Sequence, residues 1–103
     1  GSDDQALDYF LWGTTAWIGG AASCAPLEHY KVLEAALAND FVTARTHMDK
    51  LLPLLRNMES GSYTQKVKLG CELRGIPVGG PRQPLLPLSA EDKAEFEKIF
   101  KAI

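Results

Sequence analysis

Small residues that would let a ligand approach the backbone are clustered in one segment, Ile18-Gly19-Gly20-Ala21-Ala22. Glycines let a ligand or a neighbouring side chain approach the main chain closely. In α/β folds, ligands gather at the carboxyl ends of parallel strands. The same glycines could instead serve tight packing or a bend. The segment is therefore a candidate binding site, with tight packing as the open alternative.

The side chains used in nucleophilic, acid–base and metal chemistry are scattered. His29 and His47 each stand alone on a predicted helix, so we expect surface or hydrogen-bonded histidines rather than catalytic bases. Cys24 and Cys71 lack further ligands at a metal-binding spacing, and without an export signal we expect free buried thiols. No nucleophile-elbow serine and no glycine-rich phosphate loop is present. The sequence predicts no complete catalytic set, no metal site and no cofactor.

The composition is that of a soluble globular chain of one domain's length, with 103 residues, 46% hydrophobic and 23% charged. A net charge of −2 argues against a nucleic-acid partner, and the basic run Lys66-Val67-Lys68 is expected to be a solvated helix face. No window approaches the roughly 18 apolar residues of a membrane span, and the N-terminus lacks a secretory-signal pattern. We therefore expect a cytoplasmic chain without a membrane partner.

Periodicity and capping residues predict five helices. They cover Asp3–Trp12, Pro26–Ala38, Phe41–Met58, Thr64–Arg74 and a last helix that follows Ser89. Ser2 and Gln5 are expected to form a reciprocal capping box, and Asp40 and Ser89 to cap the third and fifth helices. Pro53 lies inside the longest helix, where its missing hydrogen bond predicts a kink.

The helices carry predicted core faces. In the second helix the apolar stripe is Tyr30, Leu33 and Leu37, flanked by Leu27 and Ala36, and in the third it includes Leu51. The proline-rich segment Ile76–Leu88 is expected to be extended or turn-like, with its leucines pinned on a neighbouring surface. All seven lysines are expected in solvent.

One β-strand is predicted over Ala16–Gly20, apolar on both sides like a strand buried in a parallel sheet. A lone strand leaves its backbone donors and acceptors unpaired. The chain also opens directly on a helix start, and its first helix and strand carry more apolar surface than four helices can cover. We therefore expect that something is missing upstream.

The order of these signals resembles one protein family. They are Gly1-x-Asp3-Asp4, Ala6-Leu7-Asp8, Gly13, Trp17-Ile18-Gly19, Val67-Lys68 and Pro84-Leu85-Leu86-Pro87-Leu88. Together they resemble the C-terminal third of the dihydrodipicolinate synthase and N-acetylneuraminate lyase family, over essentially the whole chain. The resemblance implies a mainly α chain with one β-strand: the last helix, strand and helix of a TIM (β/α)8 barrel in residues 1–38, and an appended C-terminal helical domain in residues 39–103.

The resemblance also implies an activity. Family members act on pyruvate or a related 2-oxo acid through a Schiff base on a barrel lysine. By resemblance, Gly1 borders the 2-oxo acid and the carbonyl of Ile18 lies near the Schiff-base nitrogen; Gly1-Ser2 also matches the remnant of a removed tag. The family's lysine and proton-relaying tyrosine precede Gly1 in chain order. No catalytic residue is therefore expected here, and the isolated piece is expected to be inactive.

Two questions stay open at this point. The stretch 19–22 departs from the more polar sequence typical of dihydrodipicolinate synthases, so the chain could belong to an aldolase, a synthase or a dehydratase. The expected partners are a 2-oxo acid and either further copies of the protein or the missing N-terminal part. An alternative of another class is a non-catalytic helical module whose apolar faces serve assembly.

Overall fold

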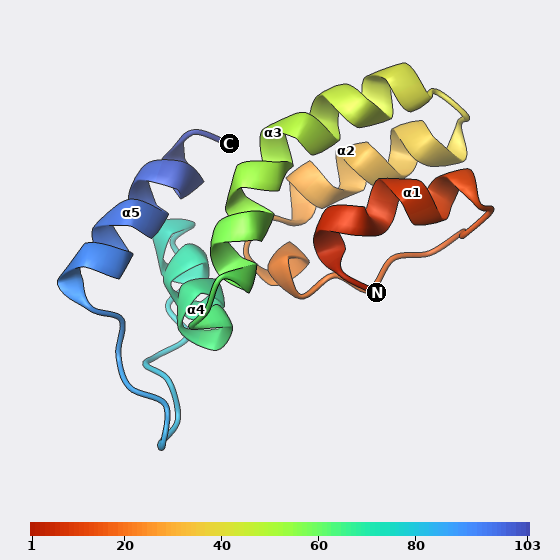
Figure 1. Ribbon diagram of the computed structural model, residues 1–103. Helices are drawn as coiled ribbons and strands as arrows, with labels where there is room; N and C mark the ends of the chain where they lie inside the picture. Colours follow the sequence, from red (N-terminus) through yellow and green to blue (C-terminus); the bar gives the residue numbers. More distant parts are fainter.

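The computed structural model describes residues 1–103 and contains only helices and the loops that join them (Figure 1). The elements in chain order are η1 (Asp3–Gln5), α1 (Ala6–Leu11), η2 (Gly20–Ser23), α2 (Pro26–Leu37), α3 (Phe41–Glu59), α4 (Tyr63–Leu73) and α5 (Ala90–Lys101), where η marks a 3-10 helix. The molecule measures 41 × 25 × 23 Å. Helices α1 and α2 pack near one end of α3, and α4 and α5 pack near the other.

Helix α3 is the central element because its apolar residues recur every three or four positions and face the core along its whole length. Its buried residues are Ala44, Met48, Leu51, Leu54, Leu55 and Met58. The helix continues through Pro53, and Figure 1 shows it bending between the half beside α2 and the half beside α4. This bend agrees with the kink expected from the missing hydrogen bond of proline.

Local capping signals are confirmed at two helix starts and fail at a third. The Asp40 side chain accepts from the Thr43 amide at 3.1 Å, and the Ser89 hydroxyl accepts from the Asp92 amide at 3.1 Å. The expected capping box of η1 is wrong, because the Ser2 hydroxyl donates instead to Glu59 Oε1 at 2.6 Å. That bond ties the start of the chain to the end of α3.

The predicted strand is absent. Residues 14–19 run between α1 and η2 without regular structure, and the Ile18 side chain is fully exposed. A strand needs a neighbour for its backbone donors and acceptors, and no other segment of this chain is extended alongside it. After Gly19 the chain turns into the short helix η2, which begins at Gly20.

The predicted core face of α2 is wrong by about one residue, although Ala36, predicted at the edge of that face, does face the core. The side chains that face the core are His29, Val32 and Ala36, whereas Tyr30 and Leu37 are exposed and Leu33 is half-buried. Small residues at 32 and 36 let α2 approach α3 closely, and this contact is the most extensive in the molecule. The larger apolar side chains of α2 therefore stay uncovered.

Lys66 is buried, although it was expected in solvent. Its ammonium group donates to the backbone oxygen of Asn57 at 2.5 Å and to the Ser60 hydroxyl at 3.3 Å. Carbonyl groups at a helix C-terminus lack partners within the helix and attract cations. The lysine therefore satisfies the last turn of α3 and joins it to α4.

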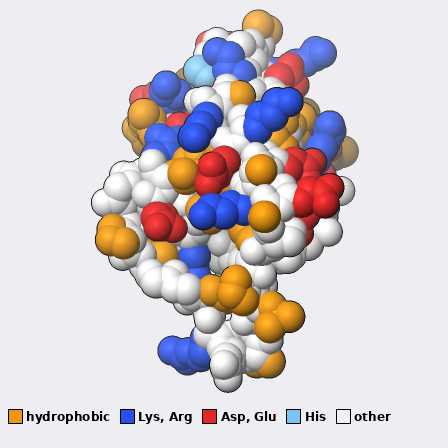
Figure 2. Space-filling model, turned by 90° about the vertical axis from the view of Figure 1, so that its left-hand side faces the viewer, with side chains coloured by type: hydrophobic (Ala, Val, Ile, Leu, Met, Phe, Trp, Pro, Cys, Tyr) orange, Lys and Arg blue, Asp and Glu red, His pale blue; other side chains and the backbone are white.

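The proline-rich segment 76–88 runs without regular structure and turns at residues 83–85, in agreement with the expectation of an extended or turn-like segment, but its leucines are not pinned on a neighbour. Leu85 and Leu86 are exposed, and only Leu88 packs against the core. The segment projects from the body below α4 and α5 in Figure 1, and Figure 2 shows hydrophobic side chains on this projection. On the rest of that face basic and acidic side chains are interspersed.

None of the helices is long and apolar enough to cross a membrane.

Candidate functional site

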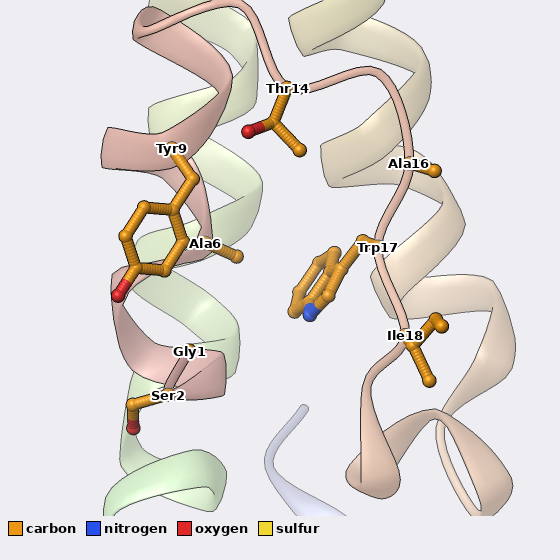
Figure 3. A pocket seen from close by; sticks show the side chains of 8 residues that line it. All are labelled: Gly1, Ser2, Ala6, Tyr9, Thr14, Ala16, Trp17 and Ile18. Carbon is orange, nitrogen blue, oxygen red and sulfur yellow. The ribbon is translucent and has the colours of Figure 1, made fainter.

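Gly1 and Ile18, the two residues predicted to contact substrate, line the same cavity of about 480 Å³. One wall comes from the start of the chain and α1, and the other comes from the segment that leads to η2 (Figure 3). The lining residues are Gly1, Ser2, Ala6, Tyr9, Thr14, Ala16, Trp17 and Ile18. The cavity forms because α1 is followed by a turn, so that the next segment runs back beside it.

Gly1 lies directly against the side chain of Tyr9. A Cβ atom placed on Gly1 would overlap the ring of Tyr9. The Tyr9 hydroxyl donates to Gln5 Oε1 at 2.8 Å, which fixes the ring beside the chain start. The close approach of ring and backbone closes one side of the cavity.

Asp3 is the polar centre behind the cavity. The residue is 8% exposed, and its carboxylate accepts from three donors on three different segments. Oδ1 accepts from the Trp17 indole N–H at 3.0 Å, and Oδ2 accepts from the Tyr63 hydroxyl at 3.2 Å and from the Ala21 amide at 3.5 Å. These bonds satisfy a buried charge, which would otherwise be costly. The carboxylate therefore joins η1, η2, α4 and the segment before η2.

Trp17 is held by aromatic packing as well as by its hydrogen bond. Its ring meets Phe10 edge-on with ring centroids 6.2 Å apart, and it lies 4.7 Å from the His29 ring. Aromatic pairs in such geometries contribute beyond their buried area. Ile18 thus follows a residue that is fixed from three sides.

Gly19 and Gly20 serve tight packing, the alternative left open by the sequence. A Cβ atom on Gly19 would lie 3.1 Å from Asp3 Oδ1, and one on Gly20 would lie 2.6 Å from the Tyr63 hydroxyl oxygen. The two glycines therefore leave room for the side chains that converge on this segment.

The Tyr63 hydroxyl is a donor throughout the physiological range. Burial raises the pKa of Tyr63 to about 12, with further contributions from the negative charge of Asp3 and from the hydrogen bond to it. The protonated phenol therefore keeps its bond to the carboxylate.

The two histidines are not placed as a catalytic pair. The Nδ1–H group of His29 donates to the Ala25 carbonyl oxygen at 2.7 Å, so Nε2 is left as an acceptor without a partner. Burial lowers the pKa of His29 more than the Ala25 carbonyl and the nearby acids raise it. His29 is therefore the hydrogen-bonded histidine that the sequence predicted, and half-buried His47 lies on α3 away from the cavity.

The two cysteines are free and buried, as predicted. Burial, followed by the proximity of Cys71, raises the pKa of Cys24 to about 11, so this thiol is protonated at neutral pH. No group of three metal-ligating side chains lies together in the chain. Gly70 of α4 packs directly against the Cys24 side chain.

Sequence reasoning missed the role of Asp3 and Tyr63. In the sequence, Asp3 stands out only as the start of a predicted helix and as part of a family motif. Tyr63 is 60 positions away in the chain, so no local spacing links the two residues. The signal available beforehand was the pair of glycines, which indicated that bulky side chains meet at residues 19 and 20.

Solved structures define the class of protein to which this fold belongs. The helical arrangement matches part of Proteus mirabilis N-acetylneuraminate lyase with a TM-score of 0.82 at 29% identity, covering 97% of this chain and 34% of that one. It matches part of a dihydrodipicolinate synthase with a TM-score of 0.89 at 32% identity, covering 98% of this chain and 35% of that one. The fold is therefore that of a segment of these enzymes.

Sequence comparison then names the family. The chain belongs to the dihydrodipicolinate synthetase family, whose model matches residues 1–103. A 4-hydroxy-tetrahydrodipicolinate synthase from Exiguobacterium sp. is 37% identical over 96 residues, which cover 93% of this chain and 33% of that protein. The chain thus spans about a third of the length of the curated relatives that it matches. The family resemblance inferred from the sequence is confirmed.

Proposed function

We propose that this chain is the C-terminal part of a lyase that acts on pyruvate or a related 2-oxo acid through a Schiff base. The observation that carries the proposal is the family match over all 103 residues. The shared cavity of Gly1 and Ile18 supports it, because the family resemblance places both residues at the substrate. In this proposal Gly1 borders the 2-oxo acid and the Ile18 carbonyl faces the Schiff-base nitrogen.

The reacting lysine and the proton-relaying tyrosine lie in the part of the protein that precedes Gly1 in this proposal. The lysine amine attacks the ketone carbon of the 2-oxo acid, a carbon–nitrogen bond forms, and the carbonyl oxygen leaves as water. Residues 1–38 then form the last part of the barrel and residues 39–103 the appended helical domain. The whole protein is cytoplasmic and forms a homo-oligomer in this proposal.

Reductive trapping tests the reaction. The full-length protein that contains this chain is incubated with pyruvate and sodium borohydride, which delivers hydride to the imine carbon and leaves a stable secondary amine. Mass spectrometry is expected to find one adduct per full-length chain and none on the 103-residue chain. An adduct on the short chain would contradict the placement of the lysine. A full-length protein that forms no adduct with pyruvate or other 2-oxo acids would contradict the function.

A second candidate function is a non-catalytic assembly module. Exposed apolar side chains favour it, among them Trp12, Ile18, Tyr30 and Leu37. Analytical ultracentrifugation of the 103-residue chain tests this candidate by measuring its oligomeric state, because an assembly module is expected to form defined oligomers. A single-species, cooperatively melting monomer would count against both the module and the expectation that these faces need a partner.

A further inference from the structure

One hydrogen bond connects the first residues of the chain to its second half. Tyr63, the first residue of α4, donates to the Asp3 carboxylate at 3.2 Å. The two residues belong to different halves of the proposed domain division, on either side of residue 38. The contact therefore joins the appended helices to the wall of the candidate site.

The same carboxylate holds the chain on both sides of Ile18. Trp17, the residue before it, donates its indole N–H to Oδ1, and the amide of Ala21 donates to Oδ2. Residues 14–19 have no ladder of backbone hydrogen bonds. Asp3 is accordingly the main polar restraint on the segment that carries Ile18.

Gly20 leaves the space that the Tyr63 hydroxyl occupies. A Cβ atom on Gly20 would lie 2.6 Å from this oxygen and 3.0 Å from Cε1 of the same ring. Any larger residue at position 20 would push the ring away from Asp3. The glycine and the tyrosine therefore fit each other, and the fit places the phenol on the carboxylate.

We propose that Tyr63 is a positioning residue of the candidate site: its hydroxyl orients the Asp3 carboxylate, which in turn fixes Trp17 and the backbone of Ile18 at the cavity. This inference rests on the proposed function, because it assigns Tyr63 a role in presenting Ile18 to the bound 2-oxo acid. Tyr63 does not touch the substrate in this scheme. It acts only through Asp3.

The test uses the full-length protein that contains this chain, with Tyr63→Phe as the variant and Tyr30→Phe as the matched control. Tyr30 is exposed, and its hydroxyl reaches only Glu34 of its own helix at 3.4 Å. Two quantities are measured with pyruvate and borohydride: the fraction of chains trapped at saturation, and the rate of imine formation per trappable chain. Fluorine NMR of fluorotryptophan-labelled protein follows Trp17, with exposed Trp12 as internal reference.

For Tyr63→Phe we expect the rate per trappable chain to fall about tenfold, as for the loss of one hydrogen bond to a charged group. The trapped fraction and the melting temperature should stay close to those of the parent, and the Trp17 resonance should shift. A merely structural role would lower the trapped fraction and leave the rate per site unchanged. Tyr30→Phe should match the parent in every measurement.

The outcomes separate this inference from the proposed function. A rate within twofold of the parent would overturn the positioning role, whether or not the Trp17 resonance shifts. If the unmodified full-length protein traps no 2-oxo acid, the proposed function fails and this role fails with it. If the parent reacts and Tyr63→Phe reacts at the parent's rate, the function stands and the inference alone is lost. Asp3→Asn, which keeps the side-chain shape, should slow the reaction at least as much as Tyr63→Phe.

Discussion

The middle of α3 and the segment before η2 carry similar apolar side chains in opposite surroundings. On α3, Leu51 and Leu55 are 1% exposed because α2 and α5 pack against the helix. Between α1 and η2, Trp12 is 88% exposed and Ile18 is fully exposed. Apolar surface stabilises a fold only when folding buries it away from solvent. A helix satisfies its own backbone and needs only a packing surface, whereas an extended segment also needs hydrogen-bond partners.

The largest effect should come from truncating the α3 stripe. Leu51→Ala is expected to lower the free energy of unfolding by about 2–5 kcal/mol, because a fully buried side chain leaves a cavity. Ile18→Ala and Val42→Ala, both at exposed positions, should each change it by less than about 0.5 kcal/mol. Urea unfolding of the 103-residue chain measures all three. Equal losses at residues 18 and 51 would break the contrast between the two regions.

A smaller loss is expected where α4 meets η2. A Cβ atom on Gly70 would lie 2.8 Å from both Cβ and Sγ of Cys24, so Gly70→Ala should cost about 1–3 kcal/mol despite the better helix propensity of alanine. The control is Gly80→Ala, which meets no atom within 4 Å and is expected to be neutral or stabilising by up to about 1 kcal/mol. Thermal melts followed by circular dichroism compare the two. A stabilised Gly70→Ala would show that the helices are not in close contact there.

The start of α5 should respond to loss of its cap. Ser89→Ala removes the acceptor of the Asp92 amide and is expected to cost about 1 kcal/mol in urea unfolding. Ser23→Ala, at an exposed hydroxyl without a hydrogen bond, should stay within about 0.5 kcal/mol of the parent. If both substitutions have the same effect, the cap contributes nothing measurable.

The smallest effect concerns the ion pair between α2 and the end of α4. Burial alone would raise the pKa of Glu28, but its hydrogen bond to Arg74 at 2.6 Å and nearby positive charges outweigh burial and lower it. A lowered carboxylate pKa stabilises the fold above the ordinary glutamate pKa of about 4.3, and this contribution is lost as pH falls through the folded value. Glu28→Gln should therefore destabilise the chain at pH 7 and have less effect at pH 3.

Urea unfolding at both pH values checks this sign. Glu72→Gln, at an exposed acid of α4 outside the ion pairs, is the control and should change the free energy of unfolding at pH 7 by less than about 0.5 kcal/mol. A Glu28→Gln effect that grew toward pH 3 would mean that the pKa of Glu28 is raised rather than lowered.

Local signals in the sequence located most helix ends, and non-local contacts explain what was missed. Asp40 and Ser89 cap helices because the acceptor and its amide lie three residues apart, a distance that the sequence displays directly. The predicted strand at Ala16–Gly20 depended on neighbours that lie outside these 103 residues or do not exist, and periodicity alone reports nothing about them. Similarly, the face of α2 was set by its contact with α3, which selected Val32 and Ala36 over larger side chains.

The candidate site was predictable only in part, for a similar reason. Gly1 and Ile18 were assigned from the family resemblance, and the structure places them on one cavity. The support behind that cavity joins Asp3 to Tyr63, and such a contact has no signature in spacing or composition. The family resemblance therefore predicted two residues of the cavity wall, whereas the contact between Asp3 and Tyr63 that supports this wall is visible only in the structure.

The burial of both cysteines has a practical consequence for fluorescent labelling. Cys24 and Cys71 are both buried, and the raised pKa of Cys24, about 11, keeps its thiol out of the nucleophilic thiolate form. A maleimide dye would therefore leave the native thiols unlabelled, and Ile18→Cys would provide a single attachment point at the mouth of the cavity. A fluorophore placed there would report the arrival of any molecule that covers this wall, without a cysteine-free background.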